Sequence, residues 1–350
     1  MPRPEIRHFS DEHLPAAAEL LARRHARDRL AEPLLPETYA TQAGALSAVE
    51  AVWRMEGAAG VAAFVGERLV GYLIGAPRIN TVIGHITWIP LAGHALASDA
   101  DADPDLTRDL YAALSPQWVA QGIFAHYALV PIHDRAALDA WYALSFGQEQ
   151  CHALLALPPV ADVPAEKAIT QAPDITIRRA MPDDLDALVA VADTIPRHQT
   201  RSPVYAPYPP ETAPTHADYD ELLADPQMVL WLALRDDHIV GYQLYQPFTA
   251  QENPLLAPLI PDRCVELAIG ATVEHARGHG VGRLLTRHGL AWATTAGYEV
   301  CLADWRTTNL LSSRFWPRIG FRPAVVRLVR RLDERIAWAH AEPTEPTEPT

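Results

Sequence analysis

Cysteine is scarce in this chain, with three residues in 350. Cys151, Cys264 and Cys301 are widely spaced and odd in number, and the last two lie in apolar segments. We therefore predict reduced core residues rather than a disulfide, a metal site or a nucleophile. The 15 histidines show no metal-binding spacing such as His-Glu-x-x-His, so no metal is expected.

Long apolar runs and excess basic charge are also missing. No run reaches the length of a membrane span, and the N-terminal stretch MPRPEIRHFSDEH has no apolar signal region. The formal charge is −14, whereas nucleic-acid binding requires a basic face. We expect a cytoplasmic protein that binds neither nucleic acid nor membranes. The acidic charge is compatible with a cationic amine substrate.

A length of 350 residues favours two domains, and the sequence repeats itself. Glu5–Phe9 corresponds to Thr176–Ala180, and Arg68–Tyr72 to His238–Tyr242, at an offset of about 170 residues. That period is too long for a solenoid and fits a duplicated domain. Between the copies, Pro158–Asp174 carries four prolines and no periodicity, which predicts a linker.

The stretch Ala276–Trp292 (ARGHGVGRLLTRHGLAW) places alternating glycines and an arginine before a helical apolar face. The preceding Cys264–Val273 is apolar and partly β-branched, which predicts a strand. The first amides of a helix lack internal partners, and the helix dipole adds partial positive charge there. Glycines let a phosphate approach the backbone closely. The sequence therefore predicts a pyrophosphate site.

The spacing of this loop narrows the choice of motif. A Walker loop would end in Gly-Lys-Ser or Gly-Lys-Thr, and the dinucleotide motif would read G-x-G-x-x-G. The segment Arg277-Gly278-His279-Gly280-Val281-Gly282 instead resembles the pyrophosphate loop of the GCN5-related N-acetyltransferases (GNAT), R/Q-x-x-G-x-G/A. In that family the loop holds the pyrophosphate of acetyl-CoA. The alternative is a glycine-rich turn that only starts a helix.

A second pattern follows downstream. Tyr298–Asp304 predicts a strand, Asn309–Gly320 a short helix, and Val325–Leu332 a last strand. An Asn followed by a short helix that ends in Gly-Phe, here Gly320-Phe321, resembles the second signature of the same family. Because both signatures occur in the family's order, the second copy resembles a GNAT domain. With the duplication, the chain resembles a tandem GNAT protein.

The resemblance implies two tandem mixed α/β folds, each with a central mixed β-sheet flanked by helices. We predict a degenerate GNAT-like domain at residues 1–157, a linker at 158–174, an N-acetyltransferase domain at 175–340 and a disordered tail at 341–350. The hairpins are expected at Gly60–Gly75 and at Val229–Tyr245, the second turning at Asp236-Asp237. The two central parallel strands are expected to splay apart and admit the pantetheine arm.

The two copies differ at the loop. In the first copy the corresponding place holds Ser98–Asp105 (SDADADPD), which has no glycine and four aspartates. Carboxylates repel a pyrophosphate, and Pro104 lacks an amide N–H. We therefore predict that the first copy does not bind CoA in the usual way, but packs on the second copy and shapes the substrate cleft.

Ile195–Ala217 has no periodicity and is rich in proline, which predicts a long irregular loop. In the family this region borders the acceptor pocket. The candidates to line a pocket are His198, Arg201, Tyr205 and Tyr208, and a solvated loop is the alternative.

The resemblance implies direct attack of an amine on the acetyl-CoA thioester. It assigns the oxygen of the thioester to backbone amides of the strand before the loop, the pyrophosphate to the loop itself, and the CoA arm to the second signature. In this sequence these residues are Ala271, Thr272 and Val273, then Arg277, Gly278, His279, Gly280, Val281, Gly282 and Arg283, and finally Asn309.

Acid and base residues are less clearly marked. Glu266 is the acid within the strand before the loop, and its apolar neighbours favour a raised pKa, so it is the first candidate for the general base. A solvated or ion-paired Glu266 is the alternative, and Asp304 is a weaker candidate base. The family often has a Tyr four residues before the Gly of the second signature, where this chain has Trp316, which has no usable acid. Tyr242 is a further candidate acid.

We therefore expect an acetyl-CoA-dependent N-acetyltransferase, active in its C-terminal domain on a primary amine of a small molecule. A non-catalytic CoA-binding or ligand-sensing tandem protein is the main alternative. An aminoacyl-tRNA-dependent transferase is disfavoured by the intact pyrophosphate loop and the acidic charge.

Overall fold

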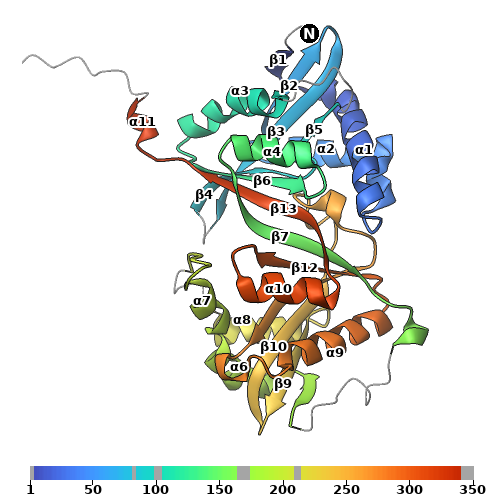
Figure 1. Cartoon of the computed structure of the whole chain (residues 1–350), viewed down its shortest axis with the longest axis vertical. Helices are drawn as coiled ribbons and strands as arrows, with labels where there is room; N and C mark the ends of the chain where they lie inside the picture. The colour runs from blue at the N-terminus through green and yellow to red at the C-terminus, as the bar shows by residue number, and fades with distance from the viewer. Residues whose placement is uncertain (1–3, 81–83, 98–104, 164–173, 209–213, 340–350) are drawn as a thin grey trace, which may run out of the picture.

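The computed structural model describes residues 4–80, 84–97, 105–163, 174–208 and 214–339. Most of the aspartate-rich stretch 98–105, most of the predicted linker and the predicted tail lie outside these residues. Figure 1 shows two α/β halves stacked along the long axis, with strands continuing from one half into the other. No helix among the described residues is long and apolar enough to cross a membrane.

Among the described residues, the first half contains four α-helices and seven strands. They are β1 (Glu5–His8), α1 (Leu14–Ala31), α2 (Gln42–Trp53), β2 (Ala59–Val65), β3 (Arg68–Asn80), β4 (Gly84–Ile89), β5 (His94–Leu96), α3 (Leu106–Ala120), β6 (Ala125–Pro131), α4 (Arg135–Ala143) and β7 (Gly147–Ala156).

Among the described residues, the second half repeats this order with three differences: an additional helix before its hairpin, no counterpart of β5, and a short helix after its last strand. Its elements are β8 (Thr176–Arg179), α6 (Leu185–Val191), α7 (Thr194–Gln199), α8 (His216–Ala224), β9 (Val229–Arg235), β10 (His238–Pro247), β11 (Cys264–Thr272), α9 (Val281–Thr295), β12 (Val300–Arg306), α10 (Leu310–Ile319), β13 (Arg322–Arg331) and α11 (Ile336–Ala339).

Local sequence explains the turns that were predicted correctly. Asp236 and Asp237 connect β9 to β10 with φ of 49° and 61°, the left-handed backbone that a two-residue hairpin turn requires. The long irregular loop was predicted less well, because its first residues belong to α7 and its last two to α8. A capping box signals the start of α8: the Thr215 side chain accepts from the Asp218 amide, and the Asp218 side chain accepts from the Thr215 amide.

The strands form one sheet through both halves, in the order β1-β2-β3-β4-β6-β13-β7-β12-β11-β10-β9-β8, with β5 on β3. The last strands of the two halves are exchanged. β13 lies between β6 and β7, where Val326 pairs with Val130 and Cys151, and β7 pairs with β12 through His152 and Asp304. The halves are therefore tied together by backbone ladders, as Figure 1 shows for β7 and β13.

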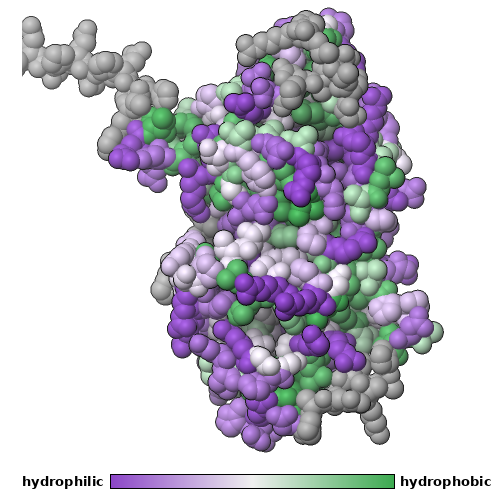
Figure 2. All heavy atoms as spheres, viewed as in Figure 1, coloured by the Kyte–Doolittle hydropathy of each residue, from purple (hydrophilic) through white to green (hydrophobic). Residues whose placement is uncertain are grey.

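An apolar cluster is shared by the two halves at this junction. It includes Leu91 and Leu129 from the first half, and Phe248, Leu302 and Val325 from the second. Outside the junction, Figure 2 shows polar side chains over much of one face, with apolar side chains in small groups between them.

All three cysteines are free and buried, as the sequence predicted. Burial raises the pKa of Cys151 and of Cys264 to about 12. These thiols are therefore protonated packing residues rather than nucleophiles.

Candidate active site

The glycine loop between β11 and α9 is open to a ligand. Gly278 and Gly280 have φ of 81° and 83°, and Gly280 is the N-cap of α9. No described atom outside the adjacent residues lies within 4 Å of a Cβ built on either glycine. The first amides of α9 have no intrahelical partner, so the loop presents free donors, a helix dipole and accessible backbone. These features fit an anionic ligand such as a pyrophosphate.

The side chains beside the glycines of the loop differ in their contacts and in their burial. Arg277 Nε–H donates to the carbonyl oxygen of Thr272 at 3.1 Å, which anchors the guanidinium beside the end of β11. The Val281 side chain is buried in the core, so only its backbone amide is available to a ligand. His279 and Arg283 are exposed. Their predicted contacts with CoA stay predictions.

β11 separates from its parallel neighbour partway along its length. Its register with β12 runs from Cys264 to Leu267 and ends there. On the other side, Leu244 of β10 pairs with Ile269 and Tyr245 with Leu267, so Ala268 is a bulge in β11. The bulge bends the strand away from β12. Ala268 and Gly270 are exposed in the resulting gap.

The bulge decides which amides of β11 can face this gap. The Val273 N–H donates to the Val240 carbonyl at 3.0 Å, so this amide is engaged within the sheet, and a contact of Val273 with acetyl-CoA stays a prediction. Bonded and non-bonded pairs alternate along an antiparallel ladder, so Ala271 is likewise bonded to its partner Tyr242. Gly270 and Thr272 therefore direct their amides into the gap. The sequence marked Thr272, but it could not locate the bulge that selects Gly270.

Asn309 has a structural role that the resemblance did not assign. Its Oδ1 caps α10 by accepting from the amides of Leu311 and Ser312 at 3.1 and 3.3 Å. His198 Nε2 of α7 lies 3.1 Å from the same oxygen. With Oδ1 used in this way, a contact with CoA remains a prediction for the amide nitrogen.

A second cavity of about 220 Å³ lies beside the loop. His198 and Arg201 line it with Arg277 and Glu274, whereas Tyr205 is exposed. Arg201 Nη1 lies 3.6 Å from Glu274 Oε2. The long connection after α7 therefore borders the loop rather than being only a solvated segment.

Trp316 is a packing residue. It is 7% exposed, and its ring packs edge-on against Phe315 and Phe321. A Cβ on Gly270 would lie 3.3 Å from the indole, so the ring sits directly against β11. Burial raises the pKa of Tyr242 far above that of a thiol, which makes its phenol a poor proton donor to a departing thiolate.

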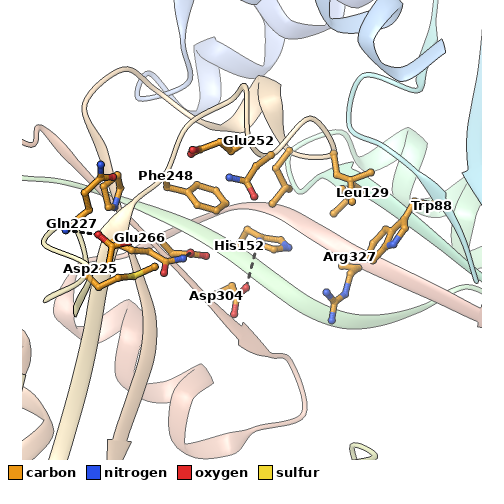
Figure 3. A pocket seen from close by; sticks show the side chains of 16 residues that line it. Trp88, Leu129, His152, Asp225, Gln227, Phe248, Glu252, Glu266, Asp304 and Arg327 are labelled. Atoms are coloured by element: carbon orange, nitrogen blue, oxygen red, sulfur yellow. Dashed lines mark hydrogen bonds and ion pairs between the residues drawn. The ribbon is translucent and has the colours of Figure 1, made fainter. Parts of the chain in front are cut away.

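A larger cavity of about 560 Å³ lies where the two halves meet (Figure 3). That volume suits a small molecule. Residues of both halves line the cavity, including Trp88, Leu129 and His152 from the first, and Asp225, Gln246, Phe248, Glu252, Glu266, Asp304 and Arg327 from the second. The first copy therefore packs on the second and contributes to this cavity, and that the cavity is the substrate cleft stays a prediction.

Glu266 is the most perturbed carboxylate of this cavity. It projects from β11, four residues before Gly270, and Gln246 Nε2–H donates to its Oε2 at 2.8 Å. Burial, and then the negative charge of Asp304, raise the pKa of Glu266 to about 7, although the Gln246 bond opposes this. A carboxylate with that pKa can accept a proton near neutral pH.

His152 and Asp304 face each other across the ladder between β7 and β12. His152 Nδ1 lies 3.7 Å from Asp304 Oδ2, and Figure 3 shows the imidazole near the middle of the cavity. Burial lowers the pKa of His152 to about 4, although Asp304 opposes this shift. Sequence reasoning missed His152, because only the strand exchange brings β7 beside β12.

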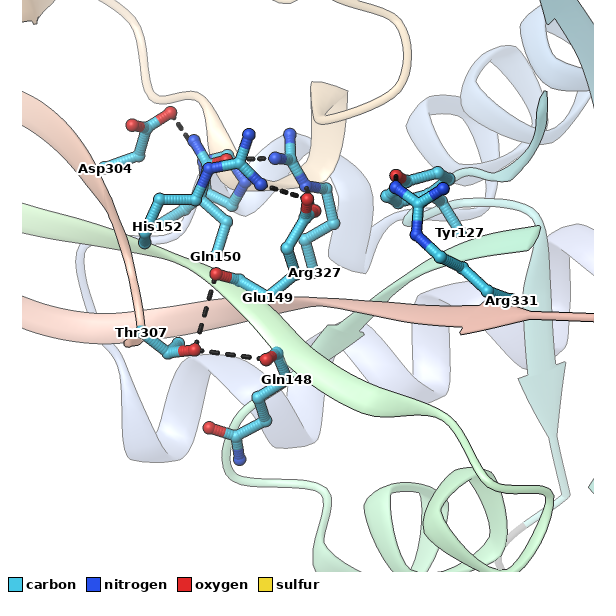
Figure 4. A network of polar contacts seen from close by, with 10 residues as sticks. Tyr127, Gln148, Glu149, Gln150, His152, Asp304, Thr307, Arg327 and Arg331 are labelled. Atoms are coloured by element: carbon cyan, nitrogen blue, oxygen red, sulfur yellow. Dashed lines mark hydrogen bonds and ion pairs between the residues drawn. The ribbon is translucent and has the colours of Figure 1, made fainter. Parts of the chain in front are cut away.

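Arg327 is the cation that lines this cavity, and it is held by a network beneath it (Figure 4). Its Nε–H donates to Glu149 Oε2 at 2.6 Å, and its other end bonds Gln150. Arg306 bonds the second oxygen of Glu149. Glu149 of the first half is thus the common partner of two arginines of the second.

Comparison with known proteins agrees with this geometry. The acetyltransferase (GNAT) family model matches residues 195–321. A GCN5-related N-acetyltransferase from Sphaerobacter thermophilus is 14% identical, with 95% of this chain and 96% of that chain covered and a TM-score of 0.59. The glucosamine N-acetyltransferase region of a fungal multi-domain GH3 beta-N-acetylglucosaminidase is 16% identical, with 94% and 38% covered and a TM-score of 0.54. No curated protein matches the chain.

Residues 195–321 therefore match the acetyltransferase (GNAT) family, and the chain has the GNAT fold in tandem. The family transfers acyl groups from acyl-CoA to amines. At these identities the two solved neighbours show the fold alone.

Proposed function

We propose that this protein is an acetyl-CoA-dependent N-acetyltransferase that acts on a primary amine of a small molecule, with its active centre in the C-terminal half. The observation that carries the proposal is the placement of Glu266. It lies on the strand that leads to the glycine loop, lines the cavity between the halves, and has a pKa of about 7.

Residues of this chain can take the following roles in acetyl transfer. Acetyl-CoA supplies a thioester whose carbonyl carbon is open to attack by a neutral amine. The amides of Gly270 and Thr272 stabilise the negative charge that develops on the carbonyl oxygen. As the new N–C bond forms, the C–S bond breaks and its electron pair leaves with sulfur, while Glu266 takes the proton of the amine. The start of α9 and Arg277 hold the pyrophosphate.

A CoA-binding sensor without catalysis is the second candidate. The packed Trp316, at the position where the family often has a Tyr, favours it, because no phenol stands there to protonate a thiolate. An ordinary thiol is partly ionised near neutral pH, however, so its thiolate can leave without direct protonation.

Calorimetric titration of acetyl-CoA into the full chain, followed by an amine screen that detects released thiol, tests the proposal. We expect one binding site per chain and turnover with at least one amine. Binding without turnover of any amine would support the sensor. An absence of binding would contradict both functions.

A further inference from the structure

The cavity between the halves is strongly acidic. Four carboxylates line it: Asp225, Glu252, Glu266 and Asp304. The cation among its lining residues is Arg327, which Glu149 and Gln150 already engage. A site with this charge attracts cations and disfavours anions.

His152 gives a second reason to expect a ligand. The side chain is buried, with the residue 5% exposed, and neither ring nitrogen has a hydrogen-bond partner among the described residues. A buried polar group without a partner costs free energy. Figure 3 shows the imidazole beside Asp304, near the middle of the cavity. A bound N–H group would satisfy the lone pair of a neutral imidazole.

Two of the four carboxylates lie on strands, and the other two lie in loops. Glu266 and Asp304 project from β11 and β12, which form the floor beside the gap. Asp225 follows α8, and Glu252 lies on the connection after β10, so both belong to loops. Apolar groups also line the cavity, among them Leu129, Phe248 and Leu255. A cavity lined by both carboxylates and apolar groups matches a ligand whose cationic groups are joined by methylenes.

We propose that the acceptor is an aliphatic di- or polyamine. One nitrogen reaches Glu266, Asp304 and His152 as the neutral, reacting amine. A second, positively charged nitrogen binds the loop carboxylates Asp225 and Glu252, while the carbon chain lies against the apolar wall. This inference rests on the proposed function, since it names the acceptor class of the same site.

Steady-state kinetics with two probes test this inference on the full chain. Both 1,4-diaminobutane and n-butylamine have a reacting primary amine on the same carbon chain, but only the diamine carries the second charge. We expect kcat/KM with acetyl-CoA to be at least about tenfold higher for the diamine, the size expected of one charge-assisted hydrogen bond. Equal values would overturn the inference and leave the proposed function standing.

Variants locate the second charge. The double variant Asp225→Asn, Glu252→Gln keeps the shape and the local hydrogen bonds of both loops but removes their charge. It should raise KM for the diamine about tenfold or more, with little change in kcat or in the constants for n-butylamine. Asp220→Asn, on the exposed face of α8, is the matched control. An undiminished advantage of the diamine in the double variant would contradict the assignment. Turnover of neither probe nor any screened amine would sink the proposed function itself.

Discussion

Glu266 shows how one position acquires a chemical property from its surroundings. Its carboxyl group is largely withdrawn from water, and Asp304 on the neighbouring strand adds a like charge. Both effects disfavour ionisation, and the Gln246 amide offsets only part of them. The group is therefore balanced between its two protonation states near neutral pH, which is where a general base works best.

The pH dependence of turnover should report this residue. Glu266 accepts a proton only when ionised, so kcat/KM should be low below its pKa of about 7 and rise as the pH increases through that value. In Glu266→Gln this step should disappear, and turnover should fall about a hundredfold or more while acetyl-CoA still binds normally. An unchanged pH profile in the variant would remove Glu266 from the role of base.

Stability measurements can show that this variant remains folded. The pKa of Glu266 in the folded chain is raised above its unfolded value, so its contribution to stability is lost as the pH rises through about 7. At pH 8, Glu266→Gln should therefore be at least as stable as the wild type.

At the scale of elements, the strand-loop-helix unit from β11 to α9 brings the binding features together. The role of its glycines could be predicted from the sequence, because a glycine is needed where φ is positive or where a ligand must approach the backbone closely. The bulge at Ala268 could not be predicted from the sequence, because it depends on how β11 pairs with β10, which is a different segment of the chain. The sequence consequently did not mark Gly270, and it marked Val273, whose amide is engaged by Val240.

Gly280→Asp should abolish acetyl-CoA binding. The substitution puts a side chain on a left-handed residue and a negative charge at the start of α9, where a pyrophosphate would bind. Gly297→Asp is a matched control, because Gly297 has φ of 93° and open space, but lies after the other end of the helix. Calorimetry should show loss of binding in the first variant and normal binding in the second. Equal losses would mean that strain rather than the loop explains the effect.

For the molecule as a whole, the exchange of β7 and β13 determines where the cavity lies. The duplication was predictable from repeated local patterns about 170 residues apart. The pairing of β7 and β13 could not be predicted, because both strands have apolar patterns that suit either position in the sheet. His152 and Trp88 therefore escaped prediction as cavity residues.

Glu149 should be important for holding the halves together. Its side chain is 15% exposed between Arg306 and Arg327, so Glu149→Ala leaves two arginines without their shared partner. We expect the free energy of unfolding to fall by about 3 kcal/mol in urea titrations. Glu299→Ala, which removes an exposed ion pair with Arg263, should cost less than about 1 kcal/mol. Similar losses in both variants would argue against a special role of Glu149.

The exchanged strands also set an order for synthesis on the ribosome. Tyr127 on β6 and Arg331 on β13 are bonded to each other but lie 204 residues apart in sequence. At roughly 5–20 residues per second, about ten to forty seconds separate their translation. During that time β6 lacks β13, the strand that covers its edge in the complete chain. The edge of β6 is therefore exposed to other chains and to chaperones until β13 has been synthesised and can pair with it.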